Sequence, residues 1–147
     1  MSTATIGRID TTTLSYDLLN SGRTGAYCTF VKIGSRGLKT YKSENERDRH
    51  YQHQLDLSLA SLAPETFGTI DCMLHDGSMR YAYWTECAEC ADDVHNDEWV
   101  ERKDCAVLAE LQDRLEEFGY PWNDDHSGNW GYVDDRKRAV IIDTPGY

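Results

Sequence analysis

Two acids and an amide near the end of the chain have the residue types and the spacing to hold a cation. Asp124 and Asn129 flank the short loop DDHSGN, and Asp143 follows the apolar run VII. We expect the residues between Asn129 and Asp143 to form a β-hairpin, which brings the three side chains together. Converging carboxylates repel one another, and a bound divalent cation relieves that repulsion. Asn129 and Asp143 are therefore the predicted Mg²⁺ ligands, and Asp124 is left as the predicted base.

A hairpin and a long helix are expected to position this loop. Strands are predicted over 130–133 and 139–142, with a turn at Asp134 and Asp135. An amphipathic helix precedes the loop and ends at Gly119, followed by a proline that prevents its continuation. The apolar residues predicted to share one face of this helix are Val100, Val107, Leu108, Leu111, Leu115 and Phe118.

The first half of the chain has the turn signals of an antiparallel sheet. β-Branched and aromatic residues predict strands at 26–33 and from residue 38 to 41, joined by the turn GSRG. An Asp-Gly turn predicts a second hairpin with strands at 66–74 and 79–85. The segment 11–19 is expected to add a short strand or a turn.

A helix is expected between these two hairpins. Ser43 is its predicted N-cap, with Glu46 three residues later completing a capping box. The helix is predicted to run to about residue 62, where Ala-Pro ends it, and Leu55, Leu59 and Leu62 are predicted to face the core.

Length, charge and cysteine content limit the class of protein. A chain of 147 residues fits one domain, and a net charge of −11 disfavours binding to nucleic acid or to anionic membranes. The N-terminus lacks the apolar core of a signal peptide, and no window approaches the roughly 18 apolar residues that span a bilayer, so we expect a cytoplasmic protein. Five cysteines without a secretion signal are predicted to be reduced thiols.

The order of these parts resembles the protein-kinase-like superfamily. The loop DDHSGN, followed after a hairpin by VIID, is similar to the D-x-H-x-G-N catalytic loop and the metal-binding aspartate of aminoglycoside phosphotransferases, lipopolysaccharide kinases and small early kinases of some bacteriophages. The resemblance extends over about residues 21–147. It implies a minimal α+β kinase-like domain that binds ATP and Mg²⁺. Residues 1–86 correspond to an N-lobe, an antiparallel sheet with one helix, and 87–147 to a reduced C-lobe with one long helix, the catalytic loop and a hairpin.

The resemblance also implies roles for individual residues. Lys39 contacts the ATP phosphates, and Glu46 is its ion-pair partner, with Glu44 as the substitute. Asp124 orients or deprotonates the attacking hydroxyl group. Gly22 and Gly25 correspond to a degenerate glycine-rich loop that contacts the nucleotide. Glu86 and Ala88 correspond to the hinge, whose backbone pairs with adenine.

The sequence departs from the family after Asp143, where the chain closes with TPGY and has no activation segment or substrate-holding helices. Two functions are therefore expected. One is transfer of phosphate to a hydroxyl group, on a protein; the other is a catalytically weak, pseudokinase-like acidic protein that binds and inhibits a host or cellular factor. The retained polar groups favour transfer. Either function implies a protein partner and a cytoplasmic location, which is the host cytoplasm if a phage encodes the chain. A homo-oligomer, in which a second subunit supplies the missing lobe, is left open.

Simpler interpretations exist for several of these residues. Isolated aspartates usually cap backbone groups in turns, Lys39 has the alternative of an exposed strand lysine, and Glu46 that of a capping residue alone. The spacing of three cysteines and one histidine is a weak signal for a zinc site, and the alternative is that the cysteines are reduced thiols. These residues are Cys87, Cys90, His95 and Cys105.

Overall fold

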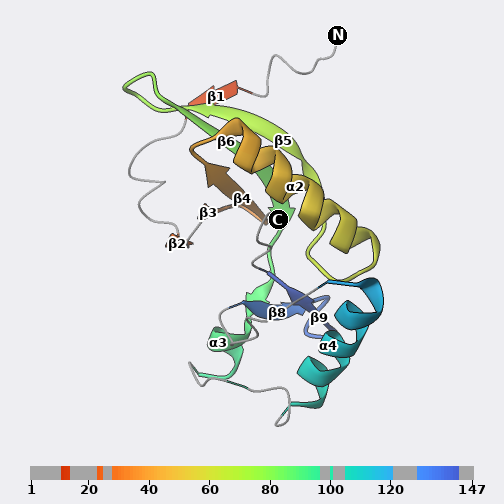
Figure 1. Cartoon of the computed structure of the whole chain (residues 1–147). Coiled ribbons are helices and arrows are strands. Elements are labelled where there is room, and N and C mark those ends of the chain that lie inside the picture. Colours follow the sequence, from red (N-terminus) through yellow and green to blue (C-terminus); the bar gives the residue numbers. More distant parts are fainter. Residues whose placement is uncertain are drawn as a thin grey trace. The chain divides into compact units, whose positions relative to one another are not determined.

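The computed structural model describes residues 11–13, 23–24, 28–96, 100, 105–120 and 129–142. The chain is an α+β protein, as predicted, and it divides into two compact units (Figure 1). The first unit comprises Met1–His53, Thr66–Glu86 and Pro145–Tyr147. The second unit comprises Gln54–Glu65 and Cys87–Thr144.

A six-stranded sheet forms the first unit, with strand order β1-β5-β6-β4-β3-β2. Its strands are β1 (Thr11–Thr13), β2 (Arg23–Thr24), β3 (Thr29–Ile33), β4 (Arg36–Tyr41), β5 (Thr66–Met73) and β6 (Met79–Glu86). The β3–β4 and β5–β6 hairpins confirm the two predicted from turn residues. Gly34 and Gly77 have φ values of 66° and 87° in these turns, a conformation that glycine adopts without strain. β1 pairs in parallel with β5, and the other pairs are antiparallel.

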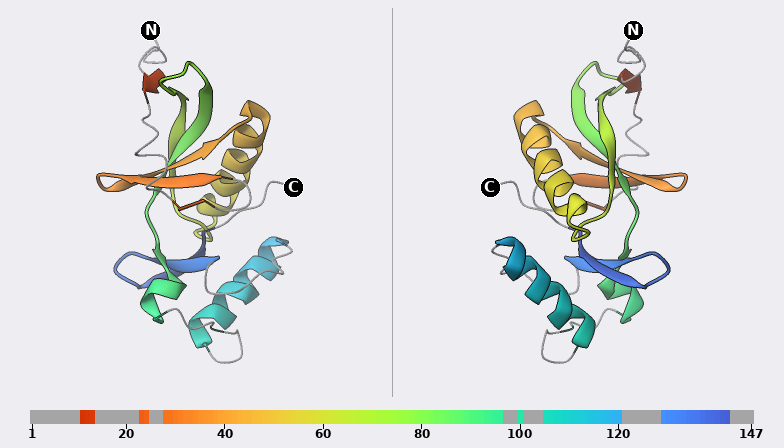
Figure 2. Two further views of the ribbon diagram at one scale, coloured as in Figure 1. Left: turned by 90° about the vertical axis from the view of Figure 1, so that its left-hand side faces the viewer. Right: turned by 90° about the vertical axis from the view of Figure 1, so that its right-hand side faces the viewer.

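Helix α2 (Glu44–Leu59) lies along one face of this sheet (Figures 1 and 2). Arg47, on its first turn, docks it there. The Arg47 guanidinium is buried and donates to the carbonyls of Ile70 and Ala82 at 3.3 and 3.1 Å, and to Oδ1 of Asp71 at 3.1 Å. Since a buried carbonyl without a donor is costly, these contacts fix which side of the helix faces the strands.

The C-terminal end of α2 corrects the predicted leucine stripe. Leu59 is 79% exposed, whereas Leu57, which lies outside the predicted stripe, is fully buried. The helix ends at Leu59, and Ser61 has a left-handed φ of 62°, so the Leu62 N–H donates to the Leu57 carbonyl at 2.9 Å. Leu62 therefore lies beyond the end of the helix. It is buried, but not on the helical face that the seven-residue spacing from Leu55 predicted.

The sheet face opposite α2 carries the apolar core of the first unit. Side chains directly opposite each other on paired strands share a face, and here Val31 pairs with Leu38 and Leu38 with Trp84. The buried members of this core are Val31, Leu38, Cys72, Leu74 and Ala82. Burial raises the pKa of the Cys72 thiol to about 11, so this cysteine is an unreactive packing residue.

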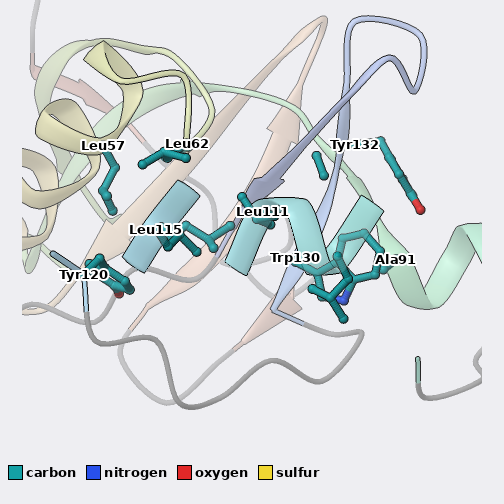
Figure 3. Packing of buried hydrophobic residues seen from close by; sticks show 12 residues of the cluster. Leu57, Leu62, Ala91, Leu111, Leu115, Tyr120, Trp130 and Tyr132 are labelled. Carbon is teal, nitrogen blue, oxygen red and sulfur yellow. The ribbon is translucent and has the colours of Figure 1, made fainter. Parts of the chain in front are cut away.

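A second core, within the second unit, packs two helices and a small sheet together (Figure 3). The elements are β7 (Glu89–Cys90), α3 (Ala91–Val94), α4 (Ala106–Phe118), β8 (Trp130–Val133) and β9 (Arg138–Ile141), with strand order β7-β8-β9. Leu57, Leu62, Leu111, Leu115 and Trp130 are buried together in this core. A Cβ atom at Gly131 would collide with the Glu89 carbonyl, so β7 approaches β8 closely only because residue 131 is glycine.

The buried face of helix α4 is rotated slightly from the predicted one. Leu108, Leu111 and Leu115 are buried, but Val107 and Phe118, which were predicted on the same face, are 43% and 46% exposed. These two residues lie at the edge of the stripe centred on the buried leucines, because successive helical residues are about 100° apart. Gly119 ends the helix as predicted, with φ of 91°. In the part of the chain that the structure describes, no helix is long and apolar enough to cross a membrane.

Candidate functional site

The base of the β8–β9 hairpin places Asn129 next to the end of β9. Trp130 pairs with Ile141, and one residue further out the Ile142 N–H donates to the Asn129 carbonyl at 3.0 Å. Asn129 itself is buried, with 9% exposure. Asp143 is the residue that follows Ile142 in the chain, and it lies outside the described residues. The predicted hairpin between the two predicted Mg²⁺ ligands is therefore confirmed up to Ile142.

Four of the predicted site residues lie outside the described parts of the chain. They are Gly22, Gly25, Asp124 and Asp143. Their roles remain predictions, as does the convergence of Asp124 and Asp143 on Asn129. Within the described ranges, we find no group of three or more histidine, cysteine, aspartate or glutamate side chains that could hold a metal. Asp124 and Asp143 lie outside these ranges.

Lys39 is a buried lysine at the centre of the six-stranded sheet. It lies on β4, which is flanked by β3 and β6, and is only 8% exposed, so the alternative of an exposed strand lysine is excluded. Lys39 pairs with Phe30 on β3 and with Tyr83 on β6. The three side chains therefore share one face of the sheet, the face along which α2 lies.

Two buried tyrosines lie beside Lys39. The Lys39 Nζ is 5.8 Å from the centre of the Tyr83 ring. Tyr41, two residues along β4, stacks on Tyr83 with ring centres 6.1 Å apart. Burial raises the pKa of Tyr83, and the charge of Lys39 opposes the rise without cancelling it. Burial likewise raises the pKa of Tyr41. Both phenols are therefore neutral at ordinary pH.

Helix α2 does not present the expected acid to Lys39. The Glu46 backbone N–H is 3.4 Å from Ser43 Oγ, which is the predicted cap, but no ion pair of the Glu46 carboxylate is found among the described residues. The substitute Glu44 lies 3.6 Å from the guanidinium of Arg47. The predicted Lys39–Glu46 pair is thus not formed. The physical reason is the rotation of the helix: docking of Arg47 on the strand carbonyls turns Glu46, one residue earlier, about 100° away.

The predicted hinge residues lie where the chain leaves the first unit. Glu86 is the last residue of β6, and Ala88 lies between β6 and β7. The Thr85 hydroxyl donates to the Glu86 carbonyl at 3.1 Å, which orients that carbonyl. The division between the two units falls directly after Glu86.

Phe30 is a neighbour of Lys39 for which the sequence analysis assigned no role. A Cβ atom at Gly37 would collide with the Phe30 ring and would lie 3.2 Å from the Thr85 methyl group. Phe30, Gly37 and Thr85 therefore pack against one another on the same face as Lys39. The signal was present in the sequence, because alternate residues of two predicted neighbouring strands share a face.

The cysteines and the histidine considered for zinc are not gathered into a metal site. Cys90 and Cys105 are the N-cap residues of α3 and α4, and none of the five cysteines forms a disulfide bond. The His95 Nε2 is 2.9 Å from the Tyr132 hydroxyl. Cys87, Cys90, His95 and Cys105 all lie within the described ranges, and they do not form a group that could hold a metal.

The comparisons with known proteins place the chain in no family. A scan against protein-family models finds no match. A search of the curated proteins also finds none.

Proposed function

We propose that the chain is a kinase-like protein that binds ATP with Mg²⁺ and transfers phosphate to a hydroxyl group, on a protein. The observation that carries the proposal is the hydrogen bond between Ile142 and Asn129 at the base of the β8–β9 hairpin. This bond joins backbone groups and places the buried residue Asn129 next to Ile142, the residue that precedes Asp143. An amide and a carboxylate are hard oxygen ligands, and such ligands together with phosphate oxygens form typical Mg²⁺ sites.

The buried amine of Lys39 supports the nucleotide half of the proposal. A lysine is seldom this deeply buried, at 8% exposure, unless its charge has a use or a partner. In the proposal Lys39 binds phosphate oxygens, and Asn129 and Asp143 hold the cation that neutralises the transferring group. Asp124 takes the proton of the attacking hydroxyl as the bond from phosphorus to the ATP leaving oxygen breaks. Gly22, Gly25, Glu86 and Ala88 are proposed as further nucleotide contacts.

A binding experiment tests the nucleotide site. ATP with Mg²⁺ is expected to raise the unfolding temperature of the protein, since a ligand at 100 times its Kd stabilises the native state by about 2.7 kcal/mol. Lys39→Met should lose most of this rise, and Lys32→Met is the matched control because Lys32 is an exposed lysine on the neighbouring strand β3. No rise in the wild-type protein, at ATP and Mg²⁺ concentrations in the millimolar range, would refute nucleotide binding.

A second experiment separates transfer from binding. Labelled phosphate from ATP is expected to enter a protein acceptor, and Asp124→Asn and Asp143→Asn are expected to abolish the label. If the wild type and both variants label alike, transfer by this site is excluded. If ATP binds and no acceptor is labelled, the second function is the better one: an acidic protein of net charge −11 that binds a protein partner in the cytoplasm, which would be the host cytoplasm for a phage protein.

A further inference from the structure

Two arginines from distant parts of the chain meet at the carbonyl of Ser61, within the second unit. The Nη2 of Arg114, on α4, donates to this carbonyl at 3.3 Å and to the Ala60 carbonyl at 3.2 Å. The Nη1 of Arg138, on β9, donates to the same Ser61 carbonyl at 3.1 Å. Asp134 lies 3.2 Å from Arg138 and supplies one of the two negative charges that this pair of cations can balance. An added anion beside Ser61 would therefore be attracted by both guanidiniums.

Ser61 itself is an exposed residue in a closed turn. The Ser61 N–H donates to the Ser58 carbonyl at 3.0 Å, and the next N–H, of Leu62, donates to the Leu57 carbonyl at 2.9 Å. The backbone that carries the hydroxyl is therefore held in place. The hydroxyl oxygen of a serine is only a few covalent bonds from the carbonyl oxygen of the same residue. Arginines that bind this carbonyl are thus within reach of a phosphate group attached to the hydroxyl.

The two arginines also have a structural role at the end of α2. This helix has no basic residue in its last turn, and positive charge stabilises the C-terminal end of a helix. The carbonyls of Ala60 and Ser61, which follow the helix directly, receive that charge from Arg114 and Arg138. This role makes no use of the Ser61 hydroxyl, so a change at the hydroxyl separates it from anion binding.

We propose that Ser61 is a phosphorylation site whose phosphate is bound by Arg114 and Arg138. An ATP-dependent serine kinase supplies the group. The bond from Ser61 Oγ to the γ-phosphorus of ATP forms, the bond from that phosphorus to the ADP oxygen breaks, and the hydroxyl proton passes to a base of the kinase. The product carries a charge of about −1.5 to −2 and three acceptor oxygens, which guanidinium groups bind well. The site shares no residue with the proposed nucleotide site and does not depend on it.

Ionisation of the phosphate tests its binding. Phosphoserine is incorporated at Ser61 during synthesis of the full chain, and phosphorus NMR measures its second pKa, which is ordinarily about 6. We expect this pKa to be lower by about one unit, because adjacent guanidiniums favour the dianion. Arg114→Gln and Arg138→Gln each keep an N–H donor for the carbonyls but lose the charge, so each should reverse part of the shift. The control Lys137→Gln removes a charge from the exposed residue next to Arg138 and should leave the pKa lowered. An unshifted pKa in the phosphorylated wild type, or a full shift in both arginine variants, would overturn the proposal.

Accessibility of the hydroxyl to a kinase is the second measurement. The unmodified protein is treated with ATP, Mg²⁺ and a serine kinase of broad specificity, and the phosphorylated residues are mapped by mass spectrometry. Ser61 is expected to be modified and Ser58 is not, since Ser58 is partly buried and its hydroxyl donates to the Leu55 carbonyl at 2.8 Å. The exposed serines Ser35 and Ser78 show that the kinase is active on this protein. Phosphate on either of them without phosphate on Ser61 would overturn Ser61 as the acceptor.

Discussion

Single buried residues set how the protein responds to high pH. Tyr41 and Tyr83 are both buried, and burial raises the pKa of each phenol above its ordinary value of about 10. A group whose pKa is higher in the folded state stabilises the protein fully below its unfolded pKa, and this contribution is lost as the pH rises above that value. The contribution of these two phenols to the free energy of unfolding should therefore decline above about pH 10, because only the unfolded chain then releases their protons.

Substitution of Tyr41 by phenylalanine should weaken this alkaline dependence. Each titrating phenol adds about 1.4 kcal/mol of lost stability per pH unit above the unfolded pKa, and Tyr41→Phe removes one of them. Urea unfolding between about pH 8 and about pH 11 measures the slope. Equal slopes for Tyr41→Phe and the wild type would show that the Tyr41 phenol ionises in the folded state.

At the scale of elements, helix α4 begins without a side-chain cap. Its N-cap residue is Cys105, whose backbone is extended and whose side chain makes no capping hydrogen bond, and no acidic residue lies in the first turn. Serine is close to cysteine in shape and is a strong N-cap, since its hydroxyl accepts a hydrogen bond from an N–H of the first turn. Cys105→Ser should therefore be more stable than Cys105→Ala by about 1 kcal/mol, as measured by urea unfolding. The alanine variant corrects for the lost thiol packing, and equal stability of the two would mean that serine does not cap.

The elements also show what a single sequence predicts and what it does not. Both hairpins of the large sheet and the β8–β9 hairpin were predicted because turn residues act locally, and the adjacency of Asn129 and Ile142 followed from the last of these. The inward residue of α2 was not predicted. Its rotation is decided by Arg47 and the carbonyls of Ile70 and Ala82, which are distant in the chain. The missed site neighbours, the tyrosines at 41 and 83, depend on strand register in the same way.

At the scale of the whole molecule, excess negative charge opposes folding. The chain has a net charge of −11, and unfolding moves like charges apart, so self-repulsion lowers the free energy of unfolding. Attractive pairs act against it. Arg136 binds both carboxylate oxygens of Glu89 at 3.0 Å, and Arg138 lies 3.2 Å from Asp134, but solvent screens such surface pairs and they add little to stability. Repulsion summed over the eleven excess charges should therefore be the larger effect.

Salt is accordingly expected to stabilise the protein. Raising NaCl from about 0.01 M to about 0.15 M shortens the Debye length from about 30 Å to about 8 Å, which screens long-range repulsion more than contacts at 3 Å. The urea midpoint should rise with an unchanged m value. Glu117→Lys, on the exposed face of α4, changes the net charge from −11 to −9 and should reduce this dependence on salt. A midpoint that falls as NaCl rises would mean that the short ion pairs at Glu89 and Asp134 outweigh the repulsion of the remaining acids.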